Sequence, residues 1–323
     1  MTPNLHTPGP VRPGARIAFV VNRAARQGRD GRVLADAARL LGERYEVETV
    51  TPAGPEGVEA AARAAAAAHD AIVVAGGDGT INRAVNGLAG SALPAGIVPL
   101  GTGNDFARAM GIPASPAAAV RVILAGRTRA VDLVRVNGRL FCTVGIIGVP
   151  ADAALTVANL TGPRSRARCA ARRLGDLAYS AAGLWHVLRP GSFVEPVAVA
   201  AGGGGAAPSA DRLPPGQVPV HAAFVTNTAM LGGGMTVPVG ADPADGMIEF
   251  AIVPRMPRVR LLAAFRRFTG NRPLPPGILR FERAARATIT CSRAVRFSAD
   301  GDLICEGDRF DVEVLPGALT LIG

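Results

Sequence analysis

The chain has 323 residues, of which 49% are hydrophobic and 19% are charged, so it can bury sizeable cores and is not disordered throughout. Its 35 basic residues are all arginine, which excludes mechanisms that need a catalytic lysine, such as Schiff-base chemistry and the Walker A phosphate loop. The net charge of +10 favours an anionic partner, namely phosphates, an acidic membrane surface or nucleic acid, or else reflects a coding preference for arginine that mainly aids solubility.

The four cysteines and four histidines are scattered without a C-x-x-C pair, so a zinc site is not expected and reduced thiols in a cytosolic protein are the default. Residues 1–15 are proline-rich and lack an apolar run, which predicts a disordered leader and no signal peptide. Proline and glycine interrupt the longest uncharged stretch, so we expect no segment that spans a membrane.

Strands and helices alternate over residues 16–130, which predicts an α/β nucleotide-binding domain with a parallel sheet. Apolar or alternating runs predict strands at 17–21, 45–50, 71–74 and 95–99. Helical spacing and end signals predict helices at 30–43, 56–69, from the glycine-rich string to 88, and 116–125.

From residue 131 to 308 the pattern changes to short strands separated by Gly, Pro and Asp turns, which predicts a β-rich sandwich domain. Its predicted strands are 131–136, 140–147, 193–200, 218–226, 247–253, 287–291 and 294–297. One arginine-rich helical stretch, 164–189, either lies on an anionic bilayer or packs on the β domain with a solvated arginine face.

The string Gly76-Gly77-Asp78-Gly79-Thr80 follows a predicted buried strand and precedes a helix. Glycines there let backbone N–H groups approach phosphate oxygens, and the helix N-terminus adds a positive dipole. The Asp78 carboxylate can hold a metal. An ordinary tight turn is the alternative, but the whole string indicates a phosphate-binding loop.

A second loop, Pro99-Leu100-Gly101-Thr102-Gly103-Asn104-Asp105-Phe106-Ala107-Arg108, follows the next predicted strand. Two such loops at the carboxyl ends of neighbouring strands form the usual ligand crevice of an open α/β sheet. Thr102 and Asn104 are therefore candidate nucleotide contacts, and Asp105 is a candidate partner of a metal.

Together these motifs resemble the diacylglycerol kinase catalytic-domain family, whose relatives include sphingosine and ceramide kinases. The resemblance extends from Ile17 to the end of the chain, through GGDGTIN, PLGTGNDFAR, VDLVRVNG, GGGMTVP…ADPADG and a late ADGD. NAD kinases and phosphofructokinases share the GGDG element, so the first domain is expected to be similar to theirs. They are not expected to carry the second motif.

The resemblance implies ATP and Mg²⁺ as cofactors. The residues it implies in nucleotide binding are Asn22, Thr51, Gly76, Gly77, Asp78, Gly79, Thr80, Ile81, Asn82, Thr102 and Asn104. In the loop after Asn22, Arg23 and Arg26 replace the family's usual Pro and Gly. Phosphoryl transfer needs positioning and charge neutralisation, which magnesium, backbone amides and arginine can supply without lysine.

The same resemblance implies an acidic network of Asp78, Asp105 and Asp132 around a catalytic Mg²⁺. A second, structural Mg²⁺ is implied at Asp245, completed by the backbone carbonyls of Asp242 and Met247; a plain acidic turn is the alternative. Oxygen ligands suit this hard ion.

The family's general base corresponds to Asp300 in Asp300-Gly301-Asp302, with Asp302 where Glu is usual. Asp300 would accept the proton of the lipid hydroxyl. The alternative is that Asp-Gly is simply a hairpin turn. The resemblance also implies that residues 309–323 return to the first domain.

These features predict a kinase that transfers the γ-phosphoryl group of ATP to a lipid hydroxyl at the inner face of the cytoplasmic membrane, with diacylglycerol as the first choice of acceptor. Another lipid such as a sphingoid base, NAD as acceptor, or a non-catalytic nucleotide- or lipid-binding regulator remain the alternatives. Few aromatic residues and no nucleic-acid motif speak against nucleic acid as partner. A homodimer is left open, since no residue indicates an interface.

Overall fold

Two units make up the chain, and each has its own hydrophobic core. The computed structural model describes residues 9–22, 30–54, 56–161, 177–189, 195–202, 216–232 and 235–323. The first unit takes in residues 1–133 and 315–323, and the second takes in 134–314. The sequence placed the first change of domain after residue 130 and the start of the returning segment at residue 309.

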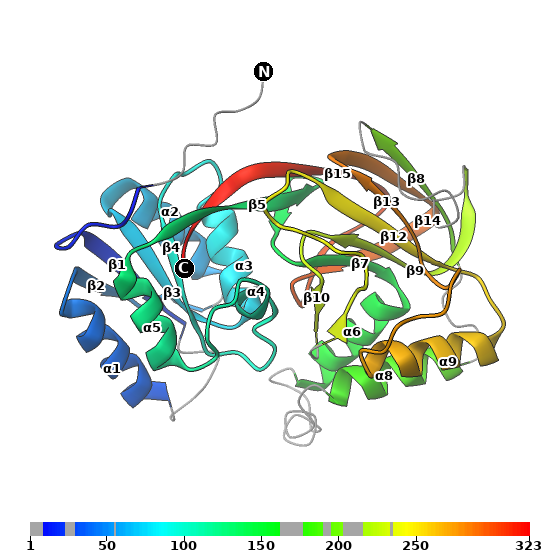
Figure 1. The fold of residues 1–323 in the computed structure, drawn as a ribbon, viewed down its shortest axis with the longest axis horizontal. Coiled ribbons are helices and arrows are strands. Elements are labelled where there is room, and N and C mark those ends of the chain that lie inside the picture. The colour runs from blue at the N-terminus through cyan, green and yellow to red at the C-terminus, as the bar shows by residue number, and fades with distance from the viewer. Residues whose placement is uncertain are drawn as a thin grey trace. The chain divides into compact units, whose positions relative to one another are not determined.

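The first unit is built on parallel strands (Figure 1). Their order is β2 (Glu46–Val50), β1 (Arg16–Val21), β3 (Ala71–Gly76) and β4 (Ala95–Pro99), and every neighbouring pair is parallel. The last residues of β15 (Asp302–Ile322) extend the sheet, because Leu321 pairs in parallel with Ala95 of β4. β1, β3 and β4 are buried almost throughout, which explains why their sequences read as continuous apolar runs.

Helices follow the strands of this unit in the order that the sequence predicts, with one short helix, α4, that was not predicted. They are α1 (Asp30–Gly42), α2 (Gly57–Ala68), α3 (Asp78–Gly87), α4 (Asp105–Ala109) and α5 (Pro116–Ala125). Residues of α1 and α5 share a core with Ile17, Phe19 and Val73 of the sheet. α2 and α3 pack closely, since a Cβ at Gly87 of α3 would lie 2.3 Å from the carbonyl oxygen of Glu59 in α2.

The ordered chain begins earlier than the sequence predicts. Val11, placed in the predicted disordered leader, is buried, and its N–H donates to the carbonyl oxygen of Gly126. Gly14 likewise donates to the carbonyl oxygen of Arg44. Burial of Val11 and Ala15 in the first core corrects the prediction for residues 9–15, while residues 1–8 lie outside the described part of the chain.

The second unit is antiparallel. Its strands lie in the order β13 (Arg280–Ala284), β12 (Ile248–Pro254), β9 (Val218–Thr226), β7 (Val144–Gly148), β14 (Arg286–Ala299) and β15. β8 (Glu195–Gly202) pairs with β14 and β9, and β5 (Thr128–Val136) pairs with β6 (Arg139–Phe141). A small separate pair joins β10 (Met230–Leu231) to β11 (Met235–Thr236).

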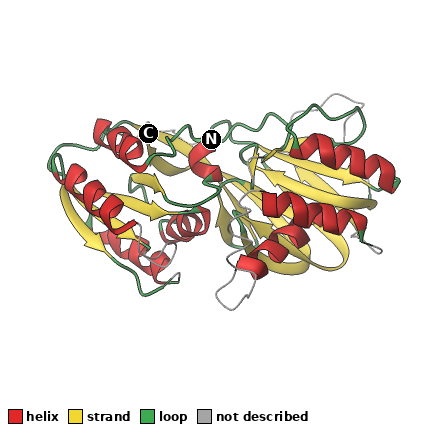
Figure 2. Ribbon diagram, turned by 90° about the horizontal axis from the view of Figure 1, so that it is seen from below, coloured by secondary structure: helices red, strands yellow, loops and turns green. Residues whose placement is uncertain are grey.

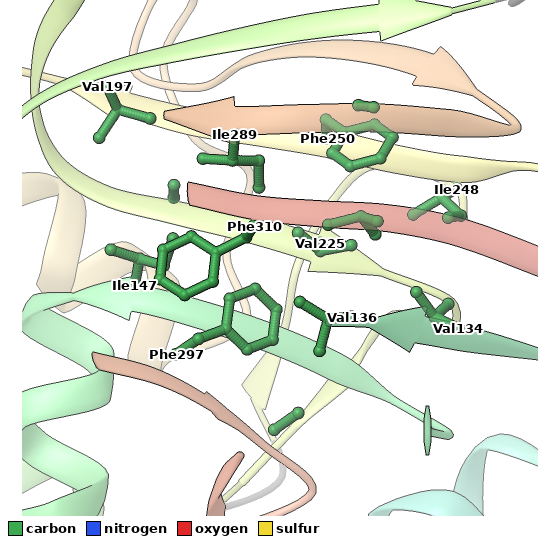
Figure 3. Close-up of a cluster of buried hydrophobic side chains, with 14 of the residues drawn as sticks. Val134, Val136, Ile147, Val197, Val225, Ile248, Phe250, Ile289, Phe297 and Phe310 are labelled. Atoms are coloured by element: carbon green, nitrogen blue, oxygen red, sulfur yellow. The ribbon is translucent and has the colours of Figure 1, made fainter. Parts of the chain in front are cut away.

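Aromatic and branched side chains fill the core between these strands (Figure 3). The ring of Phe297 lies 5.4 Å from that of Phe310 and 5.9 Å from that of Phe141. Gly145 lies against two of these rings, since a Cβ there would lie 2.3 Å from the ring of Phe297 and 3.1 Å from that of Phe141. The helices of this unit, α6 (Val149–Thr161), α8 (Leu177–Leu188) and α9 (Arg258–Thr269), lie over its strands (Figure 2).

Several elements of the second unit differ from their prediction. The single strand predicted over 140–147 is two strands, β6 and β7, and the pair predicted at 287–291 and 294–297 is one strand, β14, with an irregular register after Thr290. α6, α9 and β13 were not predicted. Of the predicted helix 164–189, residues 164–176 lie outside the described part, and α8 covers the rest up to Leu188.

Candidate active site

The predicted nucleotide-binding residues gather where parallel strands of the first unit end. Asn22 follows β1, Thr51 follows β2, and Gly76 ends β3. Pro99, the last residue of β4, is the register partner of Gly76, so the loop beginning at Leu100 starts beside the loop beginning at Gly77. The N–H of Leu100 donates to the carbonyl oxygen of Gly76 at 2.9 Å. This carboxyl edge is where ligands bind in open α/β sheets.

Glycines let the two loops touch. A Cβ on Gly101 would lie 2.7 Å from the Cα of Gly77, and one on Gly77 would lie 3.0 Å from the Cα of Gly101. Gly76 is equally restricted, because its Cβ would lie 2.5 Å from the Cβ of Thr80. Each added methyl group would force the backbone or a packed side chain to move, so both glycine-rich motifs are needed for this close approach.

Two acidic side chains converge at this point. A Cβ on Gly103 would lie 3.1 Å from Oδ2 of Asp78 and 3.5 Å from Oδ2 of Asp105. Oδ1 of Asp78 also accepts the N–H of Phe106 at 3.3 Å, which ties the start of α3 to α4. Mg²⁺ at kinase sites commonly uses one or two carboxylates together with substrate phosphates, so these residues fit the catalytic ion. No group of three or more His, Cys, Asp or Glu side chains gathers as a metal site within the described ranges.

Other residues of the glycine-rich motif shape the loop from within the protein. Asn22 is buried, and its amide donates to Oγ1 of Thr80 at 3.2 Å, so the end of β1 is joined to the first turn of α3. Ile81 and Asn82 are also buried, and Asn82 accepts hydrogen bonds from the amide of Asn86 one turn later. These contacts indicate that Thr80, Ile81 and Asn82 support the loop, whereas residues 77–79 are partly exposed.

The second loop is closed by its own asparagine. Asn104 has the left-handed φ of 50°, and its side chain accepts the N–H of Gly101 at 2.8 Å while donating to the Gly101 carbonyl oxygen at 2.9 Å. The predicted role of Asn104 in nucleotide contact is thus joined by an observed role in holding the turn. Thr102 and Thr51 are exposed at the same edge, and residues 23–29 after Asn22 lie outside the described ranges.

Asp132 has an observed partner in the returning strand. It is buried on β5, and its Oδ1 accepts the N–H of Gly317 in β15 at 2.7 Å. This hydrogen bond anchors the last part of β15 within the first unit. The predicted place of Asp132 in a magnesium network stays a prediction.

In the second unit, Asp300 lies in the hairpin turn between β14 and β15. Both turn residues have positive φ, 51° for Asp300 and 83° for Gly301, as the two-residue turn that favours Asp-Gly requires. The Asp300 carboxylate is buried and accepts three hydrogen bonds: from N–H of Cys142 at 2.8 Å, and from N–H and Oγ1 of Thr143 at 2.9 and 2.5 Å. Asp300 therefore forms the hairpin turn that was the alternative prediction, and it also presents a carboxylate held by three hydrogen bonds.

These donors explain why β6 and β7 are separate strands. Cys142 and Thr143 turn their N–H groups to Asp300, so they are not available for a continuous strand ladder. Asn227 follows β9 and is buried against the same two residues. Its side-chain amide donates to the carbonyl oxygen of Cys142 at 2.8 Å, and its backbone N–H donates to the carbonyl oxygen of Thr143 at 2.9 Å.

Thr143 and Asn227 were missed in the sequence because each follows an apolar run without a motif of its own. The only signal is the polar interruption that each makes, Cys-Thr in one run and Thr-Asn-Thr after the other. Asp302, the first residue of β15, is half-buried beyond the turn and pairs in register with Ala299.

The turn predicted to hold a structural magnesium also makes hydrogen bonds and an ion pair with protein groups. Asp245 accepts the N–H of Met247 on Oδ1 at 2.9 Å and pairs through Oδ2 with the guanidinium of Arg283. Asp242 accepts the N–H of Ala244 at 3.0 Å. Each Asp245 oxygen has a donor, one of them cationic, and the predicted structural magnesium at this turn stays a prediction.

Arg283 also lies beside a buried acid, with 3.4 Å between its Nε and Oε1 of Glu249. Burial, reinforced by the nearby Asp245 carboxylate, raises the pKa of Glu249 to about 7, although Arg283 opposes the change. The Arg283 guanidinium thus lies between two carboxylates, those of Asp245 and Glu249.

Comparison with known proteins places the chain in a family. Residues 16–136 match the diacylglycerol kinase catalytic domain, and residues 209–323 match the YegS C-terminal NAD kinase beta sandwich-like domain. A Pseudomonas fluorescens protein named "Probable lipid kinase YegS-like" is 30% identical over 295 residues, covering 90% of this chain and 89% of its own. The chain belongs to the diacylglycerol kinase and YegS-like lipid kinase family.

This lipid kinase is also 28% identical to a diacylglycerol kinase of Mycobacterium tuberculosis over 267 residues, which cover 81% of this chain and 79% of the relative. Its fold matches the crystal structure of a diacylglycerol kinase from Bacillus anthracis with a TM-score of 0.71 at 19% identity, covering 95% and 96% of the two chains. The lipid kinase is therefore a transferase with a catalytic N-terminal domain and a sandwich-like C-terminal domain.

Proposed function

We propose that this lipid kinase transfers the γ-phosphoryl group of ATP to the free hydroxyl of diacylglycerol and so produces phosphatidic acid. The observation that carries the proposal is the contact between the loops of Gly77 and Gly101, where the Asp78 and Asp105 carboxylates converge on Gly103. This combination suits a polyphosphate and its metal ion. The diacylglycerol kinases among its relatives support the choice of acceptor.

In this proposal the first unit binds the nucleotide. N–H groups at the start of α3 face phosphate oxygens, and the dipole of this ten-residue helix favours their negative charge. Thr51 and Thr102 offer exposed hydroxyl groups at the same sheet edge. The chain has no lysine, so backbone N–H groups and arginine replace the lysine that many nucleotide-binding loops use.

Asp78 and Asp105 would hold Mg²⁺. When bound, the ion neutralises charge on the transferred phosphoryl group. Asp132 completes the acidic set that the resemblance implies. The second, structural Mg²⁺ stays a prediction at Asp245, whose carboxylate also pairs with Arg283.

Asp300 would act as the general base. Its carboxylate accepts the proton of the lipid hydroxyl, the hydroxyl oxygen bonds to the γ-phosphorus, and the bond from that phosphorus to the β,γ-bridging oxygen breaks, releasing ADP. The three hydrogen bonds from Cys142 and Thr143 fix the orientation of the carboxylate. Asp302 lies two residues further along the chain, where it could assist this proton transfer.

The substrate would be met at the inner face of the cytoplasmic membrane, where the product enters phospholipid metabolism. Among the described residues, no helix has the length and apolar character needed to cross a bilayer. The proposal therefore has the enzyme act as a peripheral protein on lipid held in the membrane.

Purified protein incubated with γ-labelled ATP, Mg²⁺ and mixed micelles of diacylglycerol or a sphingoid base tests the reaction, with NAD in a parallel tube. We expect label in phosphatidic acid and a fall of at least a thousandfold in kcat for Asp300→Asn. Asp308→Asn is the matched control, because Asp308 is an exposed carboxylate on the same strand.

Label in a phosphorylated sphingoid base or in NADP would overturn the acceptor. ATP binding without label in any acceptor would overturn the reaction and favour a regulator. Full activity of Asp300→Asn would overturn the assigned base.

A further inference from the structure

Helix α8 exposes its large apolar side chains and buries its small ones. Leu177, Leu184, Trp185 and Leu188 have exposed fractions of 67%, 37%, 63% and 54%. The buried positions are Ala178, Ala182, Gly183 and Val187. Leu177, Leu184 and Leu188 are spaced by seven and four residues, so they lie along one side of the helix. A surface helix of a globular protein normally shows the reverse pattern, with its apolar stripe on the core.

Helix α9 lies beside α8 and extends this face. A Cβ on Gly183 would lie 2.7 Å from the ring of Phe265, so the helices touch closely. Val187 and Leu261 share one buried cluster, and Arg258 at the start of α9 donates to the carbonyl oxygen of Arg189 at the end of α8. The two helices are therefore antiparallel, as they are seen in Figure 1.

The exposed apolar residues of α9 adjoin those of α8. Val259 is 83% exposed and Leu262 is 37% exposed. Leu262 comes four residues after Arg258, which donates to Arg189, and three residues before Phe265, which touches Gly183, so it lies on the side of α9 next to α8. Val259 is three residues earlier and shares that side. We call the set Leu177, Leu184, Trp185, Leu188, Val259 and Leu262 the α8–α9 surface.

Positive charge surrounds this surface, and negative charge is absent from the helices that form it. Arg189, Arg258 and Arg266 are exposed on or beside the two helices. Neither α8 nor the whole stretch from Arg255 to Arg280 contains an Asp or Glu, although that stretch contains seven arginines. An apolar face with exposed arginines beside it is complementary to a surface that is apolar inside and anionic at its edge.

We propose that the α8–α9 surface docks this lipid kinase onto an anionic phospholipid bilayer. Leu184, Leu188 and Val259 enter the boundary between headgroups and acyl chains, Trp185 sits at headgroup depth, and the arginines pair with lipid phosphates. The inference deepens the proposed function, since it names the surface through which an enzyme of lipid hydroxyls meets its bilayer. A second copy of the chain fits less well, because it would bring two arginine-rimmed faces together.

Trp185 is the only tryptophan in the chain, so its fluorescence reports on this surface alone. Vesicles of phosphatidylcholine with phosphatidylglycerol are added to the protein without ATP. We expect a blue shift of the emission, protection from acrylamide quenching, and weaker binding to pure phosphatidylcholine or at higher salt. An unchanged spectrum with vesicles that bind the protein would overturn the proposal, because another surface would then make the contact.

Variants that keep Trp185 test the other residues by vesicle sedimentation. Leu188→Ser and Val259→Ser should each weaken binding roughly tenfold, and Arg189→Gln and Arg266→Gln each roughly fivefold. Matched controls are Leu303→Ser, a half-exposed leucine on β15, and Arg121→Gln, an exposed arginine on α5. If the controls weaken binding as much as the test variants, the effect is not specific to the α8–α9 surface and the proposal fails.

Two further outcomes separate this proposal from its alternatives. A blue shift that grows with protein concentration in the absence of lipid, together with a dimer in sedimentation velocity, would overturn it in favour of a second copy. Vesicle binding is measured without turnover, so an inactive protein that still binds through Trp185 would refute the proposed reaction and leave the docking surface standing.

Discussion

The contact between Gly77 and Gly101 provides the sharpest test of the site, and Gly101→Ala is the smallest change that addresses it. The new Cβ would lie 2.7 Å from both the Cα of Gly77 and Oδ1 of Asn104. Two carbon atoms are in optimal contact at roughly 3.5–4.0 Å, so the loops must separate by about 1 Å. This movement would displace the Asp78 and Asp105 carboxylates from each other, because each is carried by one of the two loops.

The size of the effect follows from this overlap. An added methylene in a well-packed place costs roughly 1–3 kcal/mol, which in a unit of this size corresponds to a fall in Tm of roughly 3–10 °C. Misplacement of reacting groups by about 1 Å can lower the rate roughly 100-fold. We therefore expect a moderate loss of stability and a much larger loss of kcat/KM for ATP.

Differential scanning fluorimetry and the labelled-ATP assay measure these two quantities on the same preparation. Gly42→Ala is the matched control: Gly42 ends α1, has no atom within 4 Å of an added Cβ, and should gain up to about 1 kcal/mol from the better helix former. If Gly101→Ala keeps both the Tm and the kcat/KM of the wild type, the described contact between the loops is wrong.

Two further predictions concern the second unit. Thr143→Val removes the hydroxyl donor to Asp300 but keeps the N–H donor, so kcat should fall about tenfold while KM for ATP stays unchanged. Thr143→Ser restores the hydroxyl and should recover kcat. Equal loss of kcat in both variants would contradict a positioning hydrogen bond. The pKa of Glu249 is raised from 4.5 to about 7 in the folded state, so protonated Glu249 favours folding. Its contribution to stability is therefore present below about pH 4.5 and is lost as the pH rises to about 7. Urea unfolding of Glu249→Gln should lack this dependence, whereas equal pH profiles would refute the raised pKa.

The sequence alone predicts much of the first unit. Its strands β1, β3 and β4 are buried on both faces, so they read as apolar runs, and its helix α5 carries ordinary end signals, Pro116 and Gly126. The two glycine-rich loops are contiguous motifs at the carboxyl ends of neighbouring strands. Since neighbouring parallel strands end at one edge, spacing along the chain is enough to bring Asp78 and Asp105 together.

The second unit depended far more on tertiary contacts. Its antiparallel strands are joined across long separations, and a break such as Cys142–Thr143 exists because Asp300, 157 residues beyond Thr143, accepts its N–H group. The residues around Cys142 and Thr143 do not indicate that Asp300 is their partner. The exposed stripe of α8 was hidden for the same reason, because only packing against α9 shows which side faces outward.

What the sequence by itself determined is therefore the chemistry of the family: an Asp- and Gly-rich pair of loops, an Asp-Gly turn and a chain without lysine. Tertiary structure decided how each group is used. It showed that Asn104 closes its own loop, that Asp132 holds Gly317, and that Arg283 pairs with Asp245. The physical reason is that hydrogen bonds and ion pairs join residues far apart in the chain, and only the folded backbone brings them within reach.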